Sequence, residues 1–268
     1  MTKHLKNIVK IDQLEGGILR LILNDSKNKN ALSEQMMKEL LDHIFNASSN
    51  NSIRVIIISA VGDVFCSGHN LKEITDARNN EDEGKEYFSN LFNLCSSLMQ
   101  MIVTCSKPVI AEINGVATAA GCQLVASCDL AIASDSSKFA TPGVNIGLFC
   151  STPMVALSRN LSKKNSMKML LTGEMIDSIE AKRISLINDH VPGKNLHSAV
   201  MSVAKKIASK SLTTVKLGKE AFYRQHEMSL SEAYNYTSAI MTENSLADDA
   251  KEGIAAFLEK RDPDWNDD

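Results

Sequence analysis

Short apolar runs alternate with longer amphipathic segments through the first 150 residues, and this alternation limits the fold more than any other feature. The β-branched run Val55–Ile58 predicts a strand buried on both faces, and Val109–Ile113 predicts another. Between them, Glu86–Val103 carries apolar side chains at helical spacing, and Lys107-Pro108 follows that helix. Strands that alternate with helices predict an α/β fold with right-handed crossovers.

Beyond Ser151 the sequence predicts mostly helices. Seven amphipathic segments follow, and Asp177–Glu180 and Ser229–Glu232 have the pattern of capping boxes at helix starts. These helices are too short and too amphipathic to form a core of their own. We therefore predict an α/β core over residues 1–195 and a helical region over residues 196–268, whose apolar stripes could pack against another subunit.

Composition and charge exclude several classes of function. Lysine and arginine number 29 against 32 aspartates and glutamates, well mixed along the chain, so we expect no nucleic-acid partner. The six cysteines form no C-x-x-C pair and the six histidines do not cluster, so no metal site is expected. No apolar run is long enough to span a membrane. The first residues lack the apolar stretch of a signal peptide, which favours the cytoplasm, or the mitochondrial matrix if a leader has been removed.

Two loops that follow predicted strands consist largely of small residues. They cover residues 65–71 and 114–123, and neither matches a dinucleotide fingerprint or a phosphate-binding loop. The second loop opens a helix near Ala120, where backbone N–H groups lack helical partners and small side chains admit a ligand oxygen. Gly68 in the first loop can adopt a positive φ and turn the following N–H outward. Two such donors that converge would form an oxyanion hole, and close packing of helix on strand is the alternative.

These loops belong to a set of motifs that resembles the crotonase (enoyl-CoA hydratase/isomerase) superfamily. Order and spacing match over nearly the whole chain in the segments Asn30–Leu32, Asp63–Leu71, Lys107–Ala111, Gly121–Leu124, Cys128–Ala133 and Thr172-Gly173. A longer stretch, Ala117–Asp129 with Phe139–Gly143 and Gly147–Pro153, is similar to one branch of that superfamily. The resemblance implies an α/β, crotonase-like (ClpP/crotonase) spiral of ββα units. It also implies a C-terminal helical trimerisation region and assembly as a homotrimer or a dimer of trimers.

The resemblance further implies an acyl-CoA thioester as ligand, with no cofactor besides this substrate and no metal. The backbone N–H groups of His69 and Ala120 would then form the oxyanion hole. The residues that would contact coenzyme A are Asn28, Asn30, Ala31, Leu32, Ser67, Gly68, Asn70, Leu71 and Gly121. Phe257 and Lys260 near the C-terminus would reach the coenzyme A of a neighbouring subunit.

The sequence departs from the family where hydratases carry two glutamates. Those positions hold Gln123 and Gly143, and residues 139–156 contain no acid. A glutamine can bind water but cannot exchange a proton near neutral pH. Two functions stay open: a crotonase-type lyase or isomerase of fatty-acid and acyl-CoA metabolism, or a non-catalytic acyl-CoA-binding or regulatory protein.

Substitute acids and bases have weaker support. The imidazole of His69 has a suitable pKa, although a packed or solvated histidine is the more common case. Glu73 and Asp76 lie on a polar segment, residues 72–84, that we expect to be mobile and to point its charges to solvent. Cys66 and Cys150 flank the predicted pocket but have no neighbour that would activate a thiol.

Overall fold

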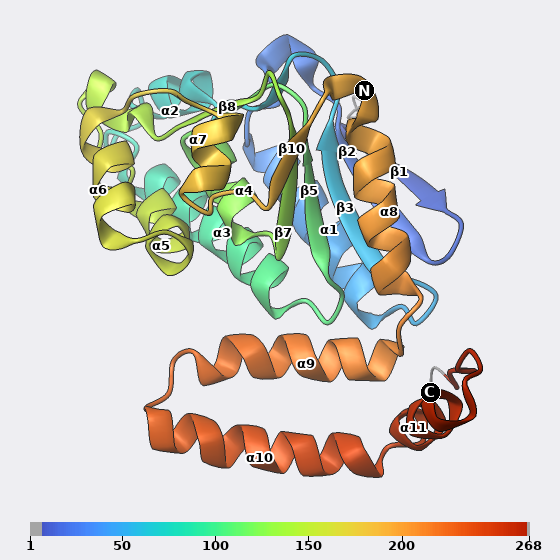
Figure 1. Ribbon diagram of the computed structural model, residues 1–268. Coiled ribbons are helices and arrows are strands. Elements are labelled where there is room, and N and C mark those ends of the chain that lie inside the picture. Colours follow the sequence, from blue (N-terminus) through green and yellow to red (C-terminus); the bar gives the residue numbers. More distant parts are fainter. Residues whose placement is uncertain (1–6, 267–268) are drawn as a thin grey trace, which may run out of the picture.

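The computed structural model describes residues 7–266, and two β-sheets form its centre (Figure 1). The larger sheet has the strand order β1-β2-β3-β5-β7-β10. Its strands are β1 (Val9–Leu14), β2 (Ile18–Leu23), β3 (Val55–Ala60), β5 (Val109–Ile113), β7 (Leu130–Ser134) and β10 (Asp189–Val191). The smaller sheet consists of β4 (Val64–Cys66), β6 (Val116–Thr118), β8 (Lys138–Ala140) and β9 (Ile176–Asp177). Among the strands of residues 7–266 only β1 with β2 and β8 with β9 pair antiparallel, and the α/β prediction is confirmed.

From β3 to β8 consecutive strands alternate between the two sheets, which gives the predicted ββα repeat. One strand of each pair (β3, β5, β7) joins the larger sheet, the next (β4, β6, β8) joins the smaller one, and a helical segment follows. The helices of this part are α1 (Glu34–Ser49), α2 (Leu71–Ala77), α3 (Lys85–Thr104), α4 (Ala120–Ser127), α5 (Ser151–Asn160), α6 (Lys163–Thr172) and α7 (Ser178–Arg183). In each ββα unit the strand of the smaller sheet is followed by a helix. The two small-residue loops lie at such strand-to-helix junctions, one between β4 and α2 and the other between β6 and α4.

Helices cover both faces of the larger sheet. On one face α1, α3 and α4 bury a large apolar cluster, which includes Met37, Leu98 and Leu124. On the other face α8 (Leu196–Ala208) packs Val200 and Ala204 against strand residues. Although α8 begins the helical region that we separated from the core by sequence, it completes the packing of the sheet. The helices that extend beyond the two sheets begin with α9.

The last three helices are α9 (Leu212–Gln225), α10 (Leu230–Leu246) and α11 (Asp248–Glu259), and α9 and α10 form a hairpin beside the core (Figure 1). The predicted capping box at Ser229 is present. A buried ion pair fastens α9 to the core, because Lys219 Nζ lies 2.6 Å from Asp129 Oδ2 and also donates to two backbone carbonyls. Tyr223 donates its hydroxyl to the other oxygen of Asp129. Within residues 7–266 no helix is both long and apolar enough to cross a membrane.

Candidate active site

The two small-residue loops meet at the N-terminus of α4. Gly68 has φ +93°, and a Cβ built on it would lie 2.8 Å from the Cβ of Ala119 and 3.3 Å from the backbone nitrogen of Ala120. Only glycine fits here, because the space is closed and the positive φ is costly for a larger residue. Since Gly68 immediately precedes His69, the two predicted donors belong to segments in direct contact.

Neither of the two predicted donors is used by the protein itself. Within residues 7–266, the backbone N–H of His69 and that of Ala120 donate to no other atom. Ala119, which caps α4, has φ 51° and ψ −120°, and a non-glycine residue in such a conformation costs about 1–3 kcal/mol. Its own N–H is bound to the carbonyl of Ala140 at 2.9 Å. The chain thus holds a strained turn that leaves the first amide of α4 unpaired.

Close packing of helix on strand, which the sequence left as the alternative, is also present. A Cβ added to Gly121 would lie 2.1 Å from the carbonyl oxygen of Cys66. Glycine at this position brings α4 against the end of β4. Close approach and unpaired amides therefore occur together, because the first loop could not reach Ala120 if α4 stood farther from β4.

The side chain of His69 is packed against protein and not solvated. Its Nδ1 lies 3.4 Å from the carbonyl oxygen of Leu32, and its ring meets the edge of Phe92 with centroids 5.5 Å apart. Its Nε2 is shielded from solvent and has no hydrogen-bond partner among the described residues. Burial lowers the pKa of His69 below its ordinary value, so the ring is neutral at pH 7.

Gln123 lies on α4 with only 4% of its surface exposed. Its Oε1 accepts a weak hydrogen bond from the Cys95 thiol at 3.8 Å, while its Nε2 donates to no other described residue. Sequence analysis missed Thr141, which is fully buried and whose hydroxyl has no partner within residues 7–266. Thr141 follows Ala140, the residue that binds the N–H of Ala119. Its place between the end of a strand and a proline is the one sequence feature that could have drawn attention to it.

Gly143 occupies a closed position. A Cβ there would lie 2.7 Å from the carbonyl oxygen of Leu148 and 2.9 Å from the Sγ of Cys150. The turn of residues 142–150 is itself closed by a hydrogen bond from Leu148 N–H to the Gly143 carbonyl. A side chain at position 143 would require this turn to open.

The segments predicted to contact coenzyme A are joined to each other. Leu32 N–H donates to the carbonyl of Gly68 at 2.7 Å, and Ser67 N–H donates to the carbonyl of Lys29. Asn30 is fully buried and donates its side-chain amide to two carbonyls near β4, so it holds the loop in place. Ala31 lies buried beside it, Asn28 is paired with Asp25, and Asn70 caps α2, where Leu71 is exposed.

Phe257 and Lys260 lie outside this set within one chain. Phe257 is 83% exposed on α11, and Lys260 is the residue that ends this helix. Helix α11 packs against α9 and α10 and lies away from the α4 end of the molecule (Figure 1). Their predicted contact with the coenzyme A of a neighbouring subunit stays a prediction.

Of the two acidic candidates on residues 72–84, Glu73 is not a free base. This segment begins with α2, and the carboxylate of Glu73 accepts hydrogen bonds from Asn70, from the N–H of Glu34 and from the hydroxyl of Tyr87. Burial and this carboxylate raise the pKa of Tyr87 to about 12. Asp76 is exposed. Glu73 therefore serves to tie α2 to α1 and α3.

The thiols are also unreactive by environment. Burial raises the pKa of Cys66 and of Cys95 to about 12, and it raises the pKa of Cys150 as well. A neutral thiol is a poor nucleophile. Residues 7–266 contain no group of three or more histidines, cysteines or acids placed to hold a metal ion.

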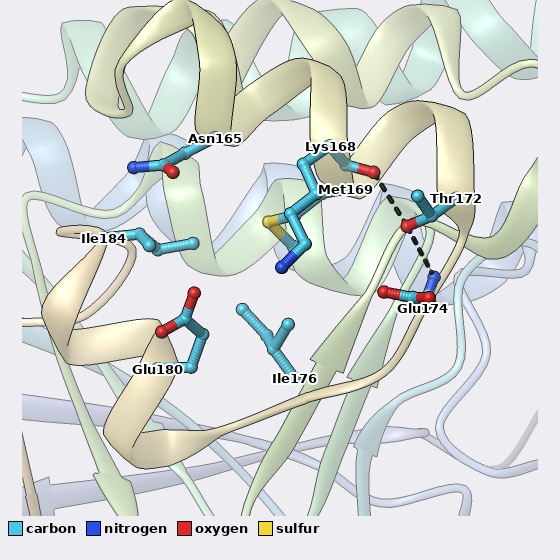
Figure 2. Close-up of a pocket in the computed structure, with 8 residues that line it drawn as sticks. All are labelled: Asn165, Lys168, Met169, Thr172, Glu174, Ile176, Glu180 and Ile184. Atoms are coloured by element: carbon cyan, nitrogen blue, oxygen red, sulfur yellow. Dashed lines mark hydrogen bonds between the residues drawn. The ribbon is translucent and has the colours of Figure 1, made fainter.

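A separate small hollow lies between α6 and the segment 174–184 (Figure 2). Its cavity volume of about 10 Å³ has room for no more than one water molecule. Lys168, Met169 and Thr172 line it from α6, and Glu180 and Ile176 line it from the other side. It is too small for an acyl group.

Known proteins of similar sequence and structure show the family of this chain. A family model described as enoyl-CoA hydratase/isomerase matches residues 13–268. The chain belongs to this family. It is 49% identical over 265 residues to enoyl-CoA hydratase domain-containing protein 3, mitochondrial, of Xenopus laevis. The aligned region covers 98% of this chain and 88% of that protein. This relative belongs to the branch that the segments 117–129, 139–143 and 147–153 resemble.

Solved structures give the same result. The crystal structure of human enoyl-CoA hydratase domain-containing protein 3 is 48% identical and matches with a TM-score of 0.91, over 96% of this chain and 100% of that one. An enoyl-CoA hydratase from Mycobacterium smegmatis is 41% identical with a TM-score of 0.92, over 97% and 99% of the two chains. The predicted crotonase-like fold is confirmed, and the protein is a crotonase-type enzyme by family.

Proposed function

We propose that the protein binds an acyl-CoA thioester with the thioester oxygen between the N–H groups of His69 and Ala120. The observation that carries this proposal is the contact of Gly68 with the start of α4, together with the absence of any acceptor for these two amides among the described residues. Two N–H donors directed at one oxygen stabilise the enolate that forms when the α-carbon loses a proton. Each donor contributes about 3–4 kcal/mol in comparable sites.

The reaction we propose is not the usual hydration of an enoyl thioester. Hydration requires carboxylates that hold and activate water. The positions that the family resemblance assigns to them hold Gln123, which cannot exchange a proton, and Gly143, around which the turn is closed. Decarboxylation of a malonyl-type thioester, or isomerisation with a proton carried by substrate or water, needs the oxyanion hole but not this pair.

Coenzyme A would lie along the joined loops of residues 28–32 and 67–71. In this proposal the chain forms a homotrimer or a dimer of trimers, and Phe257 and Lys260 complete the coenzyme A site of a neighbouring subunit. Their exposure in the single chain supports such a contact. Light scattering gives the oligomeric state, and Lys260→Ala should weaken binding of acyl-CoA in the oligomer. Unchanged affinity would remove Lys260 from the site.

A non-catalytic acyl-CoA-binding or regulatory protein is the second candidate. It is favoured by the engagement of the Glu73 carboxylate, which already accepts hydrogen bonds from three donors. Calorimetry with several acyl-CoAs, beside an assay that follows loss of enoyl absorbance from crotonyl-CoA, separates the candidates. Binding without any turnover on enoyl, malonyl-type or saturated thioesters supports the second, and robust hydration would refute our interpretation of Gln123 and Gly143.

Ala120→Pro tests the oxyanion hole directly. Proline removes one donor at the first residue of a helix, where it is best tolerated. We expect turnover of whichever thioester reacts to fall by about 10²–10³-fold. Lys163→Pro changes the first residue of α6 in the same way and should leave turnover intact. Equal activity of both variants would eliminate the proposed role of Ala120.

The compartment is a further part of the proposal. The relatives at 46–49% identity are named as mitochondrial proteins, which supports the mitochondrial matrix over the cytoplasm. Fractionation of cells that express the natural protein distinguishes the two.

A further inference from the structure

We infer that the imidazole of His69, in addition to its backbone N–H, takes part in the reaction as the base that removes the α-proton of the bound thioester. This inference rests on the proposed function, because it needs a thioester bound at the amides of His69 and Ala120. It supplies the proton acceptor that Gln123 and Gly143 lack.

The contact with Leu32 fixes the tautomer of the ring. Nδ1 of His69 lies 3.4 Å from the carbonyl oxygen of Leu32, and a carbonyl oxygen can only accept a hydrogen bond. Nδ1 therefore carries the hydrogen, and Nε2 of the neutral ring carries the free lone pair. A lone pair at Nε2 is what a general base requires.

Nε2 is also buried without a donor. Among residues 7–266 only a few buried side-chain atoms lack a partner, and Nε2 of His69 is one of them. Leaving such an atom unpaired is unfavourable, so its presence needs a reason. The edge contact with Phe92 restricts rotation of the ring and keeps this nitrogen in place. A ring held in one orientation with its basic nitrogen unpaired is prepared for a partner that the protein does not supply.

The base and one oxyanion donor would come from the same residue, and because Nε2 is shielded from solvent, a bound acyl group must displace the side chains packed over it. The N–H of the same residue is the proposed donor to the thioester oxygen, and the α-carbon is bonded to the carbonyl carbon that carries this oxygen. The C–H bond at the α-carbon breaks, its proton goes to Nε2, and the electron pair moves to the thioester oxygen as an enolate. The imidazolium then returns a proton to the α- or γ-carbon, so atoms and charge balance without a further reactant.

The titratable groups of α1, α2, α3 and β4 that are at least partly buried are Glu34, Glu39, His43, Glu73, Tyr87, Cys95 and Cys66, and the other charged groups of these helices are exposed. Glu39 accepts the N–H groups of Ile8 and Val9. Glu73 is bound by three donors and Glu34 is paired with Lys38. The raised pKa values of Tyr87, Cys66 and Cys95 keep those groups neutral over the range in which the imidazole titrates.

Exchange of α-protons in heavy water tests the inference without knowledge of the natural substrate. The purified full chain is incubated with butyryl-CoA in D₂O, and incorporation of deuterium is followed by mass spectrometry. His69→Asn keeps the backbone N–H and offers a side-chain N–H to Leu32, but it has no basic nitrogen. We expect exchange to fall by about 10²–10⁴-fold, with binding of butyryl-CoA by calorimetry within a few fold of the unchanged protein. His43→Asn, which removes an uninvolved histidine of α1, is the matched control.

The outcomes separate this inference from the proposed function. If the unchanged protein fails to bind butyryl-CoA, the proposed function fails and the inference fails with it. If binding holds and His69→Asn exchanges as fast as the control, the imidazole is not the base, although the oxyanion hole stands. If His69→Asn does not fold, His69→Gln is measured in the same way. Exchange in the unchanged protein should also rise with pH through a pKa below the ordinary 6.5 of histidine, and a flat profile would count against the ring.

Discussion

Gly121 gives the sharpest test of how the site is built. A methyl group at this position would lie 2.1 Å from the carbonyl oxygen of Cys66 and 2.8 Å from its carbonyl carbon. Both are backbone atoms, so α4 and β4 must move apart. Such overpacking costs about 1–3 kcal/mol, and two short contacts with backbone place Gly121→Ala at the upper end. Alanine regains at most about 1 kcal/mol as the better helix former. The net loss is about 2 kcal/mol, which lowers the melting temperature by roughly 4–8 °C in a chain of this size.

Gly218→Ala is the matched control, because Gly218 lies inside α9 with nothing within 4 Å of an added Cβ. It should gain about 0.5–1 kcal/mol from helix propensity alone. Urea unfolding and thermal melts of the two variants decide the matter, and calorimetry with an acyl-CoA should show weaker binding by Gly121→Ala only. If both variants are equally stable and bind alike, close approach of α4 to β4 does not build the site.

Three further changes test other parts of the structure. Lys219→Met removes the partner of Asp129 in a buried pair, so it should cost about 3–5 kcal/mol and speed proteolysis of the last three helices; resistance equal to the unchanged protein would contradict this. Trp265, the single tryptophan, follows Asp264, whose N–H is bound by Glu252, and Arg261 and this N–H lower the pKa of Glu252 to about 2. The hydrogen bond from Asp264 N–H to the Glu252 carboxylate is complete above the ordinary glutamate pKa of 4.5 and is lost as pH falls toward 2. Tryptophan emission should therefore shift to the red in that range and not at pH 6–8. Gly143→Glu should lower the melting temperature without producing hydration of crotonyl-CoA, and measurable hydration would show that the turn opens easily.

The sequence predicts the frame of this protein well, because its signals are local. The run at Val55–Ile58, the helix Glu86–Val103 and the box at Ser229 each depend on a few neighbouring residues, and each is found where expected. The meeting of the two glycine-containing loops was implied by the family resemblance, because the residues alone left close packing as the alternative. Those parts of the site that a repeat places together could be predicted before the structure.

What the sequence could not supply depends on contacts between distant residues. Nothing near His69 in the chain indicates that Phe92 and the carbonyl of Leu32 would bury its ring. Asp129 was expected to bind backbone, and it does accept the N–H of Val109, but its ion pair reaches ninety positions along the chain. The engagement of Glu73 by three donors is likewise a product of packing and not of spacing.

The closed turn around Gly143 has a consequence for how this chain could change over time. A new carboxylate there meets a main-chain oxygen and a sulfur before it meets any water. On the proposed function, a gain of carboxylate-assisted hydration at position 143 passes through strained variants, and a library of single replacements selected for hydration should return nothing from this position. Recovery of that chemistry calls for the whole stretch from Pro142 to Cys150 to be exchanged as one unit.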